Sequence, residues 1–198
     1  MHINSIDLFK LKPGQYCLNC QSQLVKETTN SQNQVFYSCP VCYSCNSRVL
    51  EIDPNLKLKR DSQGWVHFTA GALIVDNFKN AQKFLIIKKR KHPYLYDVVA
   101  GHIAKNETPR QALKREVKEE VEGTIQQRKL LLDIIISPDP CRRGVDTHRW
   151  YLFLCTLKNK IVPDPDEVAD INWYTREQLS KLEFVSPTAK MLKILKII

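Results

Sequence analysis

Residues 101–120 read Gly-His-Ile-Ala-Lys-Asn-Glu-Thr-Pro-Arg-Gln-Ala-Leu-Lys-Arg-Glu-Val-Lys-Glu-Glu, and no other part of the chain constrains its structure as strongly. At about 100° per residue along a helix, Glu116, Glu119 and Glu120 fall within roughly one third of the circumference. Carboxylates gathered in this way repel one another unless a cation lies between them. Because carboxylate oxygens suit Mg²⁺ or Mn²⁺, and such ions also bind substrate phosphates, this segment predicts a divalent-metal site for a phosphorylated ligand.

The helix that carries these glutamates has a readable start. Thr108 is a good N-cap, Pro109 suits the first helical position, and Gln111 at N3 completes a capping box. An apolar stripe at four-residue spacing is expected to pack on the rest of the domain: Leu113, Val117 and Val121. The alternative interpretation is a solvated charged face, which is the usual explanation of an isolated Glu-Glu pair on a lysine-rich helix.

The fixed residues of this segment resemble the Nudix box, whose pattern is Gly, five residues, Glu, seven residues, Arg-Glu, an aliphatic, any residue, Glu-Glu. The matching positions are Gly101, Glu107, Arg115, Glu116, Val117, Glu119 and Glu120. The resemblance implies an α/β/α sandwich with a mixed sheet, and hydrolysis of the pyrophosphate bond of a nucleoside diphosphate linked to another moiety. It also implies that the last three glutamates bind Mg²⁺ or Mn²⁺.

The same resemblance suggests roles for individual side chains. Arg115 is expected to orient a glutamate, and Glu107 to support the metal shell. The base that activates water is left open between Glu119 in the box and Glu167, which is similar in placement to a loop glutamate of some members. Glu167 can equally be a turn residue on a polar loop. Gly101 is expected to line the substrate site.

The end of the box departs from the usual pattern. Members commonly close it with Glu-Glu-x-Gly, whereas here Glu120 is followed by Val-Glu and only then by Gly123. A glycine one residue late can still stop the helix at its C′ position. The departure lies beyond the predicted ligands, so it affects the following loop more than the metals.

The second informative pattern is a pair of Cys-x-x-Cys knuckles separated by eighteen residues. Two knuckles at this spacing are typical of a four-cysteine zinc ribbon, so a structural Zn²⁺ is expected on Cys17, Cys20, Cys39 and Cys42. Cys45 leaves an alternative, because Cys42 and Cys45 also form a knuckle. A disulfide framework needs an oxidising compartment, and the chain begins without signal-peptide features, so metal and the cytoplasm are favoured.

These patterns divide the 198 residues into a zinc ribbon at 1–52, a linker at 53–64 and a Nudix hydrolase domain at 65–198. The domain is predicted to be α/β, because apolar runs of strand length flank the box helix. The expected strands are 65–75, 83–88, 130–136, 150–157 and 171–174, and the segment 94–99 leads into the box loop. Helices are expected after Thr175 and from Ser186 to Ile198. Cys155 is expected to be a buried thiol in a strand, and Cys141 to lie in a loop.

A formal charge of +9 favours polyanionic partners such as a phosphorylated nucleotide or an RNA 5′ end. The basic residues at 88–91 and the pair Arg142 and Arg143 are candidates for substrate binding, although such runs are usually solvated faces. No segment is apolar and long enough to span a bilayer. The amphipathic tail 191–198 is expected to pack on the core rather than on a membrane or a partner. Oligomeric state is left open, with a homodimer among the alternatives.

A zinc ribbon followed by a Nudix domain is similar to the domain order of NADH pyrophosphatases and their deNADding relatives. That subfamily carries a Ser-Gln-Pro-Trp-Pro-Phe-type motif after the box, and this chain has Ser137-Pro-Asp-Pro-Cys141. The resemblance therefore extends to the reaction class and not to the substrate. The alternative from another class is a nucleotide- or RNA-binding regulatory protein that retains the box with little catalysis. The intact glutamates favour the enzyme.

Overall fold

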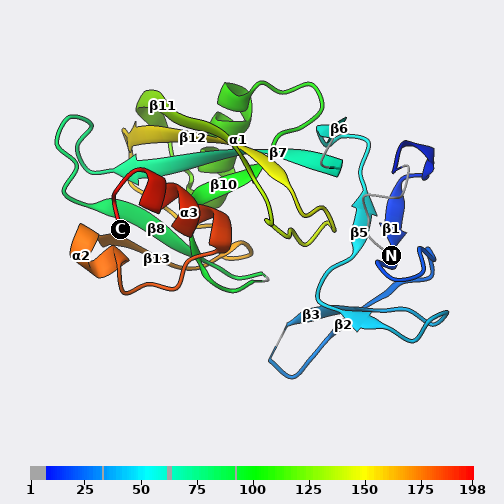
Figure 1. Cartoon of the computed structure of the whole chain (residues 1–198). Helices are drawn as coiled ribbons and strands as arrows, with labels where there is room; N and C mark the ends of the chain where they lie inside the picture. Colours follow the sequence, from blue (N-terminus) through cyan, green and yellow to red (C-terminus); the bar gives the residue numbers. More distant parts are fainter. Residues whose placement is uncertain (1–7, 33, 62–63, 92) are drawn as a thin grey trace.

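A mixed sheet of eight strands occupies the centre of the computed structural model, which describes residues 8–198 apart from residues 33, 62–63 and 92 (Figure 1). The strands are β6 (Leu58–Asp61), β7 (Gly64–Val75), β8 (Phe84–Lys89), β9 (Tyr96–Asp97), β10 (Val99–His102), β11 (Ile125–Ile136), β12 (His148–Leu157) and β13 (Val168–Tyr174). The main order across the sheet is β11-β12-β7-β8-β13, with β6 and β10 beside β7, and β9 beside β8. β7 and β12 run parallel while β7 and β10 are antiparallel, so the sheet is mixed.

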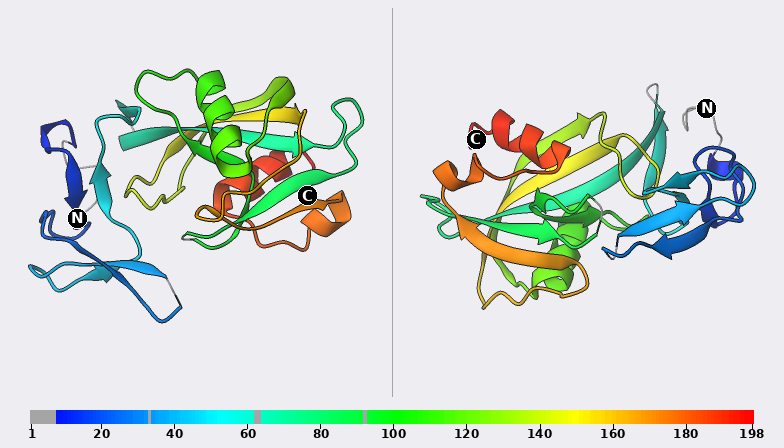
Figure 2. Two further views of the ribbon diagram at one scale, coloured as in Figure 1. Left: turned by 180° about the vertical axis from the view of Figure 1, so that it is seen from behind. Right: turned by 90° about the horizontal axis from the view of Figure 1, so that it is seen from below.

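Helices cover both faces of this sheet. α1 (Pro109–Val121) lies on one face and α3 (Ser186–Ile194) on the other, and the short α2 (Arg176–Leu179) follows β13 (Figures 1 and 2). Consecutive side chains of β7 point to opposite faces of the sheet, since Ile74 belongs to the core under α1 and Val75 to the core under α3. The α/β/α sandwich predicted from the sequence is confirmed.

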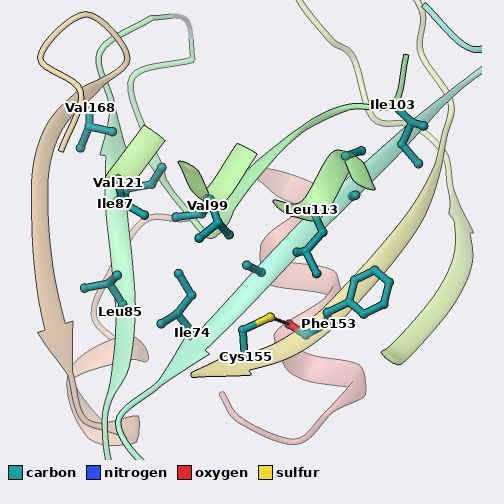
Figure 3. Close-up of a cluster of buried hydrophobic side chains, with 14 of the residues drawn as sticks. Ile74, Leu85, Ile87, Val99, Ile103, Leu113, Val121, Phe153, Cys155 and Val168 are labelled. Atoms are coloured by element: carbon teal, nitrogen blue, oxygen red, sulfur yellow. Dashed lines mark hydrogen bonds between the residues drawn. The ribbon is translucent and has the colours of Figure 1, made fainter. Parts of the chain in front are cut away.

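The box helix begins as its capping residues predict. The backbone N–H of Gln111 donates to Thr108 Oγ1 at 3.3 Å, and the Thr108 N–H donates to Gln111 Oε1 at 2.9 Å. The apolar stripe of the helix is fully buried and shares one core cluster with residues of β7, β8 and β12, and Figure 3 shows Leu113 beside Phe153. The packed stripe fixes which arc of the helix carries the glutamates.

The end of α1 differs in detail from the expectation. The helix stops at Val121, and the residue with left-handed backbone is Glu122, with φ of 49°, rather than Gly123. Gly123 is needed for space, since a Cβ there would lie 2.6 Å from Cγ1 of Val117. The late glycine therefore lets the chain turn closely over the end of the helix.

Strand and helix positions agree with the sequence patterns, but several bounds differ. β11 begins at Ile125, five residues before the predicted start, because an edge strand with a mostly exposed polar first half lacks an apolar signal. Gly101 lies in β10. α3 ends at Ile194, and Met191 within it is fully buried, so the tail packs on the core as expected.

The N-terminal part is a small β module that packs beside the main sheet (Figure 1). In it, β1 (Gly14–Tyr16) pairs with β5 (Leu50–Ile52), and a three-stranded sheet lies beside this pair. Cys17 and Cys20 follow β1, whereas Cys39 and Cys42 lie between the second and third strands of the sheet. The bounds of that sheet and of the preceding short helix are β2 (Lys26–Thr29), β3 (Val35–Ser38), β4 (Cys45–Asn46) and η2 (Leu8–Lys10). The strand β6 lies within the segment predicted to be a linker, and it pairs with β7.

The loop 137–147 joins this module to the sandwich. The Val49 N–H donates to the carbonyl of Arg142 at 3.1 Å, and the Glu51 N–H donates to the carbonyl of Arg143 at 3.2 Å. A small core cluster is shared across the junction and contains Leu8, Tyr16, Leu50, Trp65 and Val145. Among the described residues, no helix has the length and apolar character required to cross a membrane.

Candidate active site

Arg115 gathers the carboxylates of the box around one guanidinium. Its Nε and Nη2 donate to the two oxygens of Glu107 at 2.8 and 2.9 Å, which is the bidentate geometry that favours arginine over lysine. Its Nη1 donates to Glu116 Oε1 at 2.6 Å and to Glu119 Oε2 at 3.0 Å, and its Nη2 also reaches the carbonyl of His102 at 2.9 Å. Arg115 therefore links the start of the box, the helix and the end of β10.

Glu120 lies beside this group and is held from the sheet. Nζ of Lys89 donates to Glu120 Oε1 at 2.6 Å and to the carbonyl of Ala100 at 3.3 Å. The Ala100 N–H donates to the other oxygen of Glu120 at 3.2 Å. Lys89 was not singled out from the sequence, because it lies inside the basic run 88–91. Its placement at the end of strand β8 is what turns it toward the helix.

Burial changes the proton affinity of the two inner glutamates. It raises the pKa of Glu120 to about 7, even though Lys89 acts in the opposite direction. The pKa of Glu116 is raised for the same reason, with Arg115 opposing the shift. Burial alone would lower the pKa of Lys89, but the surrounding carboxylates of Glu120, Asp97 and Glu116 together outweigh burial and hold that pKa above its usual range. A divalent cation near these carboxylates would relieve the cost of burying their charge.

Gly101 brings the backbone of β10 against the helix. A Cβ at this position would lie 2.1 Å from Cδ of Glu116 and 2.1 Å from its Oε1. No side chain fits there, so the glycine of the box is required by the approach of the carboxylate. Glu107, in the segment between β10 and α1, is fixed by the Ala104 N–H, which donates to its Oε2 at 2.9 Å.

A pocket of about 440 Å³ adjoins the box and contains the predicted substrate-binding residues. Gly101, Arg142, Arg143 and Glu167 all line it. The box glutamates do not, and the connection runs through Gly101 and through Lys89, which also lines the pocket. A second hollow, of about 500 Å³, is lined by residues such as Asp76, Lys79 and Trp173, and it contains none of the predicted site residues.

The charged residues of the pocket differ in how firmly they are paired. Glu167 makes an ion pair with Lys91. Arg143 is held by two carboxylates of the N-terminal part, at 3.1 Å from Asp53 and 3.5 Å from Glu51. The two predicted base candidates therefore have different surroundings, with Glu119 bound to Arg115 and Glu167 in the lining of the pocket.

The four predicted zinc cysteines come together in the N-terminal module. Sγ of Cys17 lies 3.6 Å from Sγ of Cys42, and Sγ of Cys20 lies 3.5 Å from Sγ of Cys39. Zn–S bonds of about 2.3 Å in a tetrahedron give sulfur–sulfur edges of roughly 3.8 Å, so this set fits zinc. Cys45 is not a member of the group, which selects Cys39 and Cys42 as the second knuckle.

A family model described as NUDIX domain matches residues 66–194. The chain therefore belongs to the Nudix family, and it is a Nudix hydrolase, an enzyme that acts on phosphoanhydride bonds. No curated protein matches the chain closely enough to count as a relative.

Solved structures of low sequence identity share the fold. A MutT Nudix hydrolase from Burkholderia pseudomallei has a TM-score of 0.55 at 18% identity, covering 65% of this chain and 96% of its own. The Nudix domain of NrtR from Shewanella oneidensis, complexed with ADP ribose, has a TM-score of 0.54 at 15% identity, covering 65% and 85%. An Ap4A hydrolase from C. elegans has a TM-score of 0.50 at 19% identity, covering 66% and 93%.

Proposed function

We propose that this Nudix hydrolase uses Mg²⁺ or Mn²⁺ to cleave the pyrophosphate bond of a nucleoside diphosphate linked to another moiety. The substrate class comprises dinucleotides, nucleotide sugars and capped RNA 5′ ends. The observation that carries the proposal is the placement of Glu116, Glu119 and buried Glu120 on one arc of α1, with Glu116 against Gly101 of β10 and Glu120 bound by the Ala100 N–H. Three acids in this arrangement, with a raised pKa on two of them, favour a divalent cation over bulk water.

The residues of the box fit the metal that the family implies. Mg²⁺ or Mn²⁺ held by Glu116, Glu119 and Glu120 would neutralise phosphate oxygens and lower the pKa of a bound water. Arg115 keeps Glu116 in place, and Lys89 does the same for Glu120. Glu119 has the most exposed side chain of the three, at 56%, so it is the box residue best able to accept a proton from water.

Substrate binding is assigned to the pocket beside the box. Arg142 lines it, and a guanidinium suits bidentate binding of a phosphate. Arg143 is committed to Asp53 and Glu51, so we assign it to fixing the loop and Arg142 to the ligand. The ADP ribose of the NrtR complex and the Ap4A of the C. elegans enzyme belong to the same chemical class, in which phosphates join two larger groups.

The N-terminal module is proposed to be a zinc ribbon over residues 1–52, joined by residues 53–64 to the hydrolase domain at 65–198. Its four thiolates close the coordination shell of Zn²⁺, so this metal folds the module and leaves no position for water. Thiolate ligands persist in a reducing compartment, which favours the cytoplasm.

The experiment is a hydrolysis screen with Mg²⁺ and with Mn²⁺ over NADH, ADP-ribose, dinucleoside polyphosphates, nucleoside triphosphates and capped RNA. Glu120→Gln should lower the turnover of the best substrate by about 100-fold or more, as the loss of other preorganised electrostatic groups does. Glu122→Gln is the matched control, since Glu122 is exposed at the end of the same helix, and it should keep wild-type turnover.

Two outcomes contradict the proposal. Absence of turnover across the panel, combined with measurable nucleotide or RNA binding, would favour the regulatory alternative. Turnover that is equal in wild type and Glu120→Gln would show that the box is not the catalytic site.

A further inference from the structure

We infer that His67, His102, Cys141 and His148 form a zinc-class metal site that is separate from both the box and the four-cysteine group. The four ligand atoms lie within 4.8 Å of one another, and two of the residues, His67 and His148, are buried. The proposed role of the site is to fix loop 137–147 on the sheet. It does not depend on the identity of the substrate.

Three adjacent strands carry the histidines on one face. His148, the first residue of β12, is directly opposite His67 of β7 in the parallel pair. His102, the last residue of β10, is opposite Thr69 on the other side of β7. Since His67 and Thr69 are two residues apart, their side chains share a face, and the three imidazoles are brought together by register alone. This face is the one turned away from α1.

The distances match the edges of a metal tetrahedron. Nε2 of His102 lies 3.2 Å from Nε2 of His148, and Sγ of Cys141 lies 3.7 Å from Nδ1 of His67. Zn–N bonds of about 2.0–2.1 Å and a Zn–S bond of about 2.3 Å imply edges of roughly 3.3 Å between nitrogens and about 3.6 Å between nitrogen and sulfur. The rings are tilted by 39° to 74° instead of being stacked, as expected for imidazoles directed at a common centre.

A carboxylate lies behind one of the imidazoles. Nδ1 of His148 is 3.2 Å from Oδ2 of buried Asp139, although the pair lacks hydrogen-bond alignment and this nitrogen has no hydrogen-bond partner. The same oxygen accepts the indole N–H of Trp150 at 2.7 Å, so Asp139 is fixed independently. Metal-binding histidines almost always have an outer carboxylate or carbonyl on the ring nitrogen away from the metal.

The donor set selects the class of metal. Three imidazole nitrogens and one thiolate suit Zn²⁺ and similar transition metals, whereas Mg²⁺ and Mn²⁺ prefer the oxygens of the box. Four protein ligands leave no open position, so the ion would be structural. It would hold Cys141 in place, and with it the next residue, Arg142, in the lining of the pocket. The carbonyl of Cys141 is also held by Arg48, whose Nε donates to it at 2.7 Å.

The test is metal analysis of the full-length protein after dialysis against excess Mg²⁺ without chelator. Wild type should retain about two zinc ions per chain, one on the four cysteines and one on this site. Cys141→Ser and His67→Gln should each retain about one, and so should Cys39→Ser/Cys42→Ser, which removes the other site. Cys155→Ser is the matched control, because this buried cysteine belongs to neither group, and it should retain two.

Cobalt substitution gives a second readout that does not depend on activity. In Cys39→Ser/Cys42→Ser, added Co²⁺ should give a thiolate-to-metal absorption band, and adding Cys141→Ser should abolish it. Circular dichroism of each variant establishes that it is folded. Zinc content that is unchanged by Cys141→Ser and by His67→Gln, with no cobalt band that depends on Cys141, would overturn the inference and leave a hydrogen-bonded cluster.

Discussion

Because Gly101 has no Cβ, the carboxylate of Glu116 can lie directly against the backbone of β10. A Cβ there would lie 2.1 Å from the carboxyl carbon, so Gly101→Ala must push Glu116 away from its position beside Arg115. Because a displacement of about 1 Å at a reacting centre can cost on the order of 100-fold, we expect turnover to fall by about that factor. The Mn²⁺ dissociation constant, measured by calorimetry, should rise in parallel.

The control for this substitution is Gly71→Ala on the neighbouring strand β7. A Cβ at Gly71 would meet Trp150 at 3.3 Å and Leu152 at 3.4 Å, contacts that small shifts can accommodate. This variant should keep Mn²⁺ affinity close to that of wild type. Wild-type affinity in Gly101→Ala as well would contradict the role assigned to the glycine.

Asp97 gives stability a specific pH dependence. Burial raises its pKa in the folded protein, against the opposing effect of Lys89, while the unfolded chain titrates near the ordinary value of 3.8. Below 3.8 the carboxyl is protonated in both states, so its contribution to stability is fully present there. As pH rises through the raised folded pKa, the buried group must ionise and that contribution is lost.

Asp97→Asn cannot ionise, yet it keeps an oxygen that can accept from Thr188 and from the Val98 N–H. The unfolding free energy of the variant, minus that of wild type, should therefore increase from about pH 4 to about pH 8 in urea titrations. Asp166→Asn, at an exposed site, should give a flat difference over the same range. A flat difference for Asp97→Asn would contradict the raised pKa.

At the scale of residues, the fixed spacing of the box within one helix and the preceding loop indicates which side chains lie close together, while their metal and catalytic roles stay predictions. Glu107, Arg115 and Glu116 meet as the pattern implies. Lys89 was missed because a basic run does not reveal which member faces inward. The histidine–cysteine cluster was missed because its members are spread between positions 67 and 148, and only the register of three strands unites them.

At the scale of elements, loop 137–147 depends on Gly144. Its φ of +89° disfavours other residues, and a Cβ would lie 2.9 Å from Cα of Leu50 and 3.0 Å from the carbonyl oxygen of Val49. Gly144→Ala should lower the unfolding free energy by about 1–3 kcal/mol. Gly144→Asn separates the cost of the positive φ from the cost of the Cβ contact, since asparagine tolerates positive φ better than alanine but still has a Cβ. Unchanged stability in both variants would contradict the close packing of the loop on β5.

Elements with strong local signals were predicted closely, and those defined by distant partners were not. The start of α1 follows from Thr108 and Gln111, whose side chains act within four residues. The early part of β11 carries few apolar residues, so its strand conformation comes from pairing with β12. The strand β6 likewise owes its conformation to β7, which the polar sequence of residues 58–61 does not indicate.

At the scale of the whole molecule, the N-terminal module and the hydrolase domain share packing. Trp65, at the start of β7, and Val145 of the loop are both 1% exposed, and they belong to one cluster with Leu8, Tyr16 and Leu50. Deleting residues 1–52 should therefore expose apolar surface on the hydrolase domain and lower its melting temperature in calorimetry.

A comparison of two variants refines this prediction. Cys39→Ser/Cys42→Ser removes the proposed ribbon zinc but leaves β1 and β5 in the chain, so its melting temperature should fall less than that of the deletion. Equal melting temperatures for the deleted and full-length proteins would show that the two parts are energetically independent.

The alternation of side chains along β10 has a further consequence for how this chain can tolerate changes in length. Gly101 faces α1, and the side chain of His102 faces the opposite side of the sheet. Removing one residue just before Gly101 would place the imidazole of His102 against Glu116, and adding one would place the glycine backbone under Cys141 where that imidazole now lies. Homologues that keep both groups should therefore show no single-residue insertions or deletions between β9 and the box, while loops elsewhere vary freely.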